Sequence, residues 1–223
     1  MSKPGFEKSS VREYFESIVV AVILALFIRT FVVQAFKIPT SSMEPNLLVG
    51  DHLLVNKFVF APTATPLERG LLPIREIRRG DVVVFKYPED PERDFIKRVI
   101  ALPGETVELR NQKIVVDGTA VEERYAHYLL PAAGDSEGAG VDVRERYGPV
   151  TVPGDHLFVM GDNRDNSQDS RYWGFLPRHY VKGRALVIYW SFEQSEGETS
   201  SPISFLTRFF TGTRWGRLLH QIH

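Results

Sequence analysis

Short apolar runs separated by turn residues dominate the chain after Pro39 and restrict it to a β-rich fold. The runs are rich in Val, Ile, Leu and Phe, and Gly, Pro, Asn and Asp cluster between them. This spacing is typical of an antiparallel sandwich or barrel, and the chain lacks the repeated amphipathic helices of a βαβ plan. We therefore predict a mainly β, barrel-like antiparallel domain. The runs are 52–60, 82–87, 95–102, 106–109, 113–116, 150–152, 156–160 and 184–192.

Turn signals support this interpretation. Asp117-Gly118 separates two apolar runs and is typical of a type I′ hairpin turn, which requires positive φ at both central residues. Pro-Gly pairs at 103–104 and 153–154 predict two further turns. Residues 131–142 are small and polar and predict a surface loop.

The N-terminal apolar segment, residues 18–36, predicts one transmembrane helix. It is unbroken from Ile18 to Ile28, and Arg29, Thr30 and Gln34 interrupt the rest. As a helix it would span about 28 Å, close to the thickness of a hydrocarbon core. A cleaved secretory signal and a buried core helix are the alternatives, but no A-x-A cleavage site follows Ile28.

Basic residues predict the topology and divide the chain. Lys3, Lys8 and Arg12 precede the apolar segment, whereas only Lys37 follows it closely, so the N-terminus is expected in the cytoplasm. The tail contains a basic, aromatic stretch that could contact lipid headgroups or pack as a short helix. The expected division is a cytoplasmic segment 1–16, an anchor 17–37, a catalytic domain 38–200 with a variable insert 120–148, and a tail 201–223.

Composition excludes several classes of function. The net charge of −1 gives no basis for nucleic-acid binding. The absence of cysteine excludes disulfides, thiol catalysis and Cys-ligated zinc. The histidines lack H-E-x-x-H spacing, and Asp162, Asp165 and Asp169 do not follow the alternate spacing of an EF-hand loop. We expect neither a metal nor a cofactor.

Two sequence blocks offer candidate catalytic residues. In IPTSSMEPNLLVGD, 38–51, two prolines bracket two serines and a threonine, which suits either a presented nucleophile or a linker with a helix cap. In FIKRVI, 95–100, alternation along a strand places Lys97 on one face with Phe95 and Val99. Burial there would lower the pKa of Lys97 and make it a base, although the period alone favours a solvated lysine.

A third block, GDNRDNSQDSRYWGF, 161–175, combines many polar side chains with aromatic residues. It indicates either a locked hydrogen-bond network or an ordinary Asx-rich turn. The G-x-S-x-G sequence around Ser136 is a weaker candidate, because a nucleophile elbow must join a buried strand to a helix and this one lies in the polar loop.

Taken together, the three blocks and RGDVVVF, 79–85, resemble the conserved boxes of bacterial type I signal peptidase, the leader peptidase family. They stand in family order over roughly residues 15–192. The resemblance implies that Ser42, the serine directly before Met43, is the nucleophile, although Ser41 is a chemical rival. It implies that Lys97 is the general base of a Ser/Lys dyad.

The resemblance also implies supporting roles. The Ser42 backbone N–H and the Thr40 hydroxyl would form the oxyanion hole. Ser167 would form a hydrogen bond with the lysine and orient it, and Asp169 and Arg171 would support the site from behind. Shallow pockets for small substrate residues would be lined by Ile38, Met43, Leu47 and Ile96, whose alternative role is core packing.

The function implied is cleavage of signal peptides from exported preproteins after small residues at −1 and −3, through an acyl-enzyme. The expected location is the bacterial inner membrane, single-pass and monomeric, with the catalytic domain on the outer face. Preproteins and membrane lipid are the expected partners. A LexA-type self-cleaving protein shares this chemistry and fold but needs a DNA-binding domain in place of the anchor. A non-catalytic, membrane-anchored β-domain is the other alternative.

Overall fold

An eight-stranded antiparallel sheet forms the larger part of the computed structural model, which describes residues 10–60, 74–129, 142–193 and 209–223. Its strands lie in the order β1-β2-β11-β3-β4-β9-β10, and β12 pairs with β11. The mainly β, antiparallel prediction is therefore confirmed. The strands are β1 (Val33–Lys37), β2 (Asp51–Asn56), β3 (Val82–Tyr87), β4 (Asp90–Ala101), β9 (His156–Met160), β10 (Leu176–Pro177), β11 (Val181–Ser191) and β12 (His220–Gln221).

A second sheet of four strands has the order β7-β6-β5-β8. The predicted hairpin at Asp117-Gly118 is present between β6 and β7, with φ of 48° and 77° at the two residues. These strands form because alternate residues bury one face, as Val107, Leu109 and Ile114 do. The strands are β5 (Thr106–Arg110), β6 (Lys113–Val116), β7 (Thr119–Ala120) and β8 (Arg146–Thr151).

The N-terminal segment is helical over only part of its apolar length. Helix α1 (Ser10–Phe27) continues into the π-helix η1 (Ile28–Val32), and the chain then enters β1. The helix expected across 18–36 therefore ends early, because residues 33–37 pair with β2. Among the described helices, none combines the length and the apolar character required for a membrane crossing.

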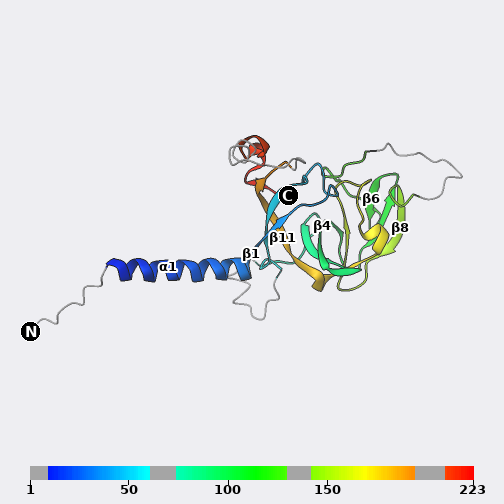
Figure 1. Ribbon diagram of the computed structural model, residues 1–223. Coiled ribbons are helices and arrows are strands. Elements are labelled where there is room, and N and C mark those ends of the chain that lie inside the picture. The colour runs from blue at the N-terminus through cyan, green and yellow to red at the C-terminus, as the bar shows by residue number, and fades with distance from the viewer. Residues whose placement is uncertain (1–9, 61–73, 130–141, 194–208) are drawn as a thin grey trace, which may run out of the picture.

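Helix α1 and the small sheet lie on opposite sides of the large sheet. Figure 1 shows α1 projecting away from the strands, whereas β6 and β8 lie at the far side. Large apolar side chains along α1 are exposed, including Ile23 and Leu24 at 62% and 56%. Three further short helices begin and end within the described residues: α3 (Ser170–Trp173), η2 (Arg178–Tyr180) and η3 (Trp215–Arg217).

Two of the predicted regions fall partly or wholly beyond the described residues. Ser136 and the loop around it lie outside them, as does the start of the tail. The described end of the tail packs on the domain, where Ile222 joins a core cluster and is 6% exposed. The ends of the 120–148 insert also belong to the domain, because residues 146–151 form β8.

Candidate active site

Ser42 and Lys97 meet in the structure although 55 positions separate them in sequence. Ser42 lies in the turn between β1 and β2, and Lys97 lies on the central strand β4. The Lys97 Nζ atom is 2.6 Å from Ser42 Oγ, and the two residues are 4% and 7% exposed. An amine and a hydroxyl at this distance can exchange a proton directly.

The surroundings of Lys97 favour its neutral form. Burial lowers the pKa of Lys97 to about 8, because removal from water penalises the charged ammonium. The negative charges of Asp169 and Asp162 oppose this shift, and the positive charge of Arg171 adds to it. The Nζ atom also lies 5.5 Å from the centroid of the Phe95 ring, on the face that alternation predicts. A neutral amine, and so a base, is accessible near physiological pH.

A cavity of about 320 Å³ opens beside these two side chains. The turn 39–42 and residues 93–97 of β4 form two of its walls, and Asn166 and Gln168 contribute a third. The Thr40 hydroxyl also lines it, 3.5 Å from Ser42 Oγ. A hydroxyl donor therefore lies where an oxyanion beside Ser42 could accept from it.

Hydrogen bonds from the 161–171 loop distinguish Ser41 from Ser42. The Asn166 Nδ2 group donates to Ser41 Oγ at 2.8 Å, whereas the Ser42 hydroxyl is the one beside Lys97. Asn163 fixes the intervening backbone, since its N–H donates to Ser42 O at 3.1 Å and its side chain donates to Ser41 O at 3.2 Å. Neither asparagine was singled out from the sequence, because two Asn in a polar loop have no distinctive pattern.

Gly161 permits the close approach of these two loops. A Cβ atom there would lie 2.4 Å from Ser42 O and 2.3 Å from Ser167 Oγ, which is closer than real Cβ contacts come. Only glycine fits this position without moving the nucleophile turn. Sequence reasoning missed this role, because the glycine requirement comes from a partner far along the chain.

Of the three predicted supporting residues, Asp169 and Arg171 pair with each other, whereas Ser167 does not make its expected contact. Asp169 and Arg171 form a buried ion pair at 2.8 Å with both side chains 0% exposed, and Asp169 also accepts from Gly161 N at 3.0 Å. Ser167 is 8% exposed, and its Oγ has no hydrogen-bond partner within the described part of the chain. The expected hydrogen bond between Ser167 and Lys97 is therefore not formed in this structure.

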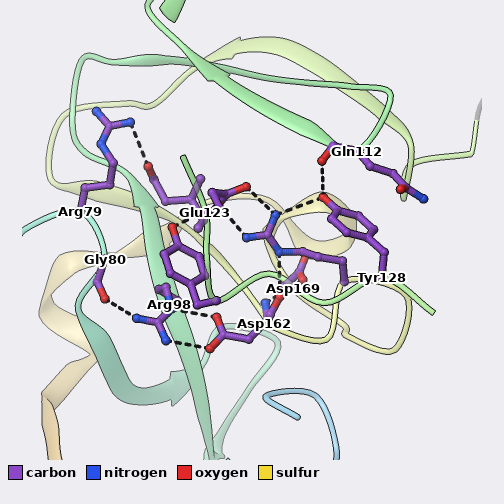
Figure 2. Close-up of polar contacts among 12 residues, drawn as sticks. Arg79, Gly80, Arg98, Gln112, Glu123, Tyr128, Asp162 and Asp169 are labelled. Carbon is purple, nitrogen blue, oxygen red and sulfur yellow. Dashed lines mark hydrogen bonds and ion pairs between the residues drawn. The ribbon is translucent and has the colours of Figure 1, made fainter. Parts of the chain in front are cut away.

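Two further buried ion pairs surround the site, and the sequence did not indicate either (Figure 2). Arg98 pairs with Asp162 at 2.7 Å, with side chains 4% and 0% exposed. Arg164 pairs with Glu123 at 2.6 Å, with side chains 0% and 6% exposed. The segment around Glu123, predicted as part of a variable insert, therefore helps to hold the 161–171 loop. Such pairs give no local signal, since their partners lie 41 and 64 positions apart.

The predicted pocket residues divide between the cavity and the core. Ile96 lines the cavity and also belongs to the core cluster. Ile38, Met43 and Leu47 lie in the core cluster below the turn and are at most 2% exposed. They face inward because the tight turn before β2 folds its apolar side chains onto the large sheet. Among the described residues, no group of three or more His, Asp or Glu side chains could hold a metal ion.

Known proteins resemble this chain over most of its length. The model of the family described as signal peptidase, peptidase S26, matches residues 11–190. Signal peptidase I of Pseudomonas aeruginosa is 35% identical over 209 residues, which cover 80% of this chain and 72% of the relative. Signal peptidase I of Aquifex aeolicus is 36% identical over 229 residues, covering 81% and 85%. A crystal structure of a signal peptidase I from Enterococcus faecalis has a TM-score of 0.40 and 32% identity, covering 50% of this chain and 97% of that one.

Proposed function

The chain belongs to the signal peptidase family, peptidase S26, and on this premise we propose that Ser42 and Lys97 form its catalytic dyad. The protein is a serine endopeptidase that cleaves signal peptides from preproteins. The observation that carries the dyad is the 2.6 Å separation of Lys97 Nζ and Ser42 Oγ inside a buried site.

Acylation follows from this geometry. Neutral Lys97 takes the proton of the Ser42 hydroxyl while Oγ attacks the scissile carbonyl carbon. The Ser42 backbone N–H and the Thr40 hydroxyl donate to the oxygen that becomes negative. The C–N bond then breaks, and the Lys97 ammonium returns the proton to the leaving amine. The product is an acyl-enzyme on Ser42 with a neutral lysine.

Deacylation uses the same base. Lys97 removes a proton from a water molecule that attacks the ester, and the proton then passes to Ser42 Oγ as the acyl group leaves. In this proposal Asp169 and Arg171 act by fixing the 161–171 loop, and Ser167 lies near the reacting groups with no hydrogen-bond partner among the described residues.

An open strand edge supports extended binding of the substrate. On one side, β3 pairs with β4 from Asp90 to Arg98, whereas on the other side β9 pairs only from Arg98 to Ala101. Within the described residues, no strand covers 93–97 on the β9 side, and this stretch lines the cavity. We propose that the preprotein adds there as a strand, with small residues at −1 and −3.

We further propose that the enzyme is a single-pass, monomeric protein of the bacterial inner membrane, with its catalytic domain on the outer face. The exposed apolar side chains of α1 and its projection from the domain support an anchor in the helical part of 17–37 and contact with lipid. The proposed units are 1–16, 17–37, 38–200 and 201–223, although residues 33–37 of the second pair with β2 and the end of the fourth packs on the catalytic domain.

Substitution of each dyad residue tests the mechanism. Ser42→Ala and Lys97→Ala should each lower kcat/KM for a model preprotein in detergent by on the order of 10⁴-fold or more. Ser41→Ala is the matched control and should retain cleavage, since its hydroxyl bonds to Asn166. Mass spectrometry of the products reports the cut position. Wild-type turnover by a folded Ser42→Ala or Lys97→Ala variant would exclude the dyad.

A further inference from the structure

The C-terminal segment 213–222 packs beneath the turn that carries Ser42, although the matched family region ends at residue 190. Strand β12 pairs with β11, and the N–H groups of Leu219 and Ile222 donate to Ile188 O and Leu186 O at 2.8 and 2.9 Å. Ile222 shares a core cluster with the inward-facing side chains of the nucleophile turn. The segment is therefore part of the domain rather than an appendage.

Arg217 is the main polar link between this segment and the turn. Its guanidinium donates to both carboxylate oxygens of Asp51, at 2.6 Å from Nη2 and 3.2 Å from Nε. The Nη2 atom also donates to Asn46 O at 2.8 Å. Asp51 is 0% exposed and accepts in addition from Leu48 N at 2.8 Å and Ser191 Oγ at 2.6 Å. A planar guanidinium satisfies this combination of a carboxylate and a carbonyl, whereas an ammonium cannot make the same fork.

The residues that Arg217 holds lead directly to the nucleophile. Asn46 belongs to the turn that begins at Met43, immediately after Ser42, and this turn is closed by the hydrogen bond from Leu47 N to Met43 O at 2.9 Å.

A second connection between Arg217 and Ser42 runs through the 161–171 loop. The Asn46 side chain donates to Asp162 Oδ2 at 2.9 Å. Asn163, the next residue, donates from its backbone to Ser42 O at 3.1 Å. Three hydrogen bonds and the peptide bond between Asp162 and Asn163 thus join Arg217 to Ser42 by this second connection.

We infer that Arg217 is a positioning residue of the peptidase, which holds Ser42 in line with Lys97 through Asp51 and the Asn46 carbonyl. The inference rests on the proposed function of the dyad. It assigns the basic tail a role in catalysis that its composition alone does not indicate. Small misplacements of a nucleophile reduce kcat strongly, because the reacting atoms must lie in a narrow range of distance and angle.

The test compares Arg217→Ala, Arg217→Lys and the surface control Arg110→Ala in the full chain with a model preprotein in detergent. Arg217→Ala should lower kcat by on the order of 10- to 100-fold, with KM changed by less than about twofold. Arg217→Lys should recover part of this loss, because it restores the charge opposite Asp51 but not the fork. Arg110→Ala should match the wild type, since Arg110 pairs with Glu108 on the exposed face of the small sheet.

The pH profile separates positioning from general damage. Arg217 is not among the groups that shift the pKa of Lys97, so the midpoint of the kcat profile should stay at its wild-type value while the plateau falls. The thermal midpoint of each variant shows that it is folded at the assay temperature. Wild-type kcat in folded Arg217→Ala, or a loss confined to KM, would overturn the inference.

Two further variants keep the test decisive. If Arg217→Ala fails to fold, Arg217→Lys and Arg217→Gln replace it, and wild-type kcat in both would overturn the inference. Ser42→Ala is measured in the same series. An active Ser42→Ala variant contradicts the dyad itself, whereas an inactive one beside a fully active Arg217→Ala contradicts only the role of Arg217.

Discussion

The small sheet and the site loop of the large sheet place their charged side chains in opposite ways. In the small sheet the interior is apolar, and the Arg110–Glu108 pair lies at the surface, with 68% of the Arg110 side chain exposed. In the 161–171 loop, Asp162 and Asp169 are 0% exposed and are each paired with an arginine. The interior of the first region is held by apolar burial, whereas the second depends on each buried charge keeping its partner.

The largest expected effect on stability comes from breaking a buried pair. Arg98→Ala leaves the Asp162 carboxylate buried without its guanidinium, and the free energy of unfolding should fall by about 3–5 kcal/mol. Arg110→Ala in the small sheet removes an exposed charge and should leave the denaturant midpoint unchanged. Chemical denaturation of both variants measures the contrast. Equal losses in the two would show that burial does not distinguish the regions.

A smaller effect, on rate, is expected at a glycine. Gly161→Ala forces a methyl group against Ser42 O, so the nucleophile turn must move and kcat should fall by roughly 10- to 100-fold. Gly154, before β9, is the matched control, because a Cβ atom there meets nothing within 4 Å. Steady-state cleavage assays compare the two. Full activity in Gly161→Ala would show that the loops separate without consequence for Ser42.

The smallest effect is a shift in a pH profile. Because only neutral Lys97 accepts a proton, kcat should rise with pH to a plateau, with its midpoint near the pKa of about 8. Asp169 raises the pKa of Lys97, so Asp169→Asn should move the midpoint to lower pH. Glu108→Gln in the small sheet should leave it unchanged. A midpoint that moves upward in Asp169→Asn would contradict the electrostatic account of the site.

The sequence predicted the local parts of the fold well. The hairpin at Asp117-Gly118 depends on two adjacent residues, and the apolar runs at 82–87 and 156–160 coincide with β3 and β9. The order of strands in the large sheet was not predictable, since it places β11 between β2 and β3. The helix end at Val32 was also missed, because the apolar residues that follow are recruited as a strand by pairing with β2.

The site residues likewise fall into those with a local sequence signal and those that depend on distant contacts. Alternation along β4 left Lys97 open to a solvated interpretation, and only the resemblance of the three blocks linked it to Ser42. The contacts of Glu123 with Arg164 and of Arg217 with Asp51 join distant segments, so no local pattern could reveal them. Gly161 was visible as a residue, but its need for a missing Cβ arises from Ser42, 119 positions earlier, which only the folded structure brings near.

Strand β4 is paired with β9 along only part of one edge, and this limits how far a bound peptide could extend along it. A peptide that pairs with 93–97 cannot slide further along the strand, because β9 occupies the edge from Arg98 onward. In the proposed binding mode, the end of β9 would therefore stop the peptide beside Lys97. Side chains of a paired peptide alternate between faces, so the residues at −1 and −3 point to the same side while −2 points away. In this proposal the preference for small residues at −1 and −3 has one cause, because both side chains point to the same side of the paired peptide. Two separate pockets are then not required.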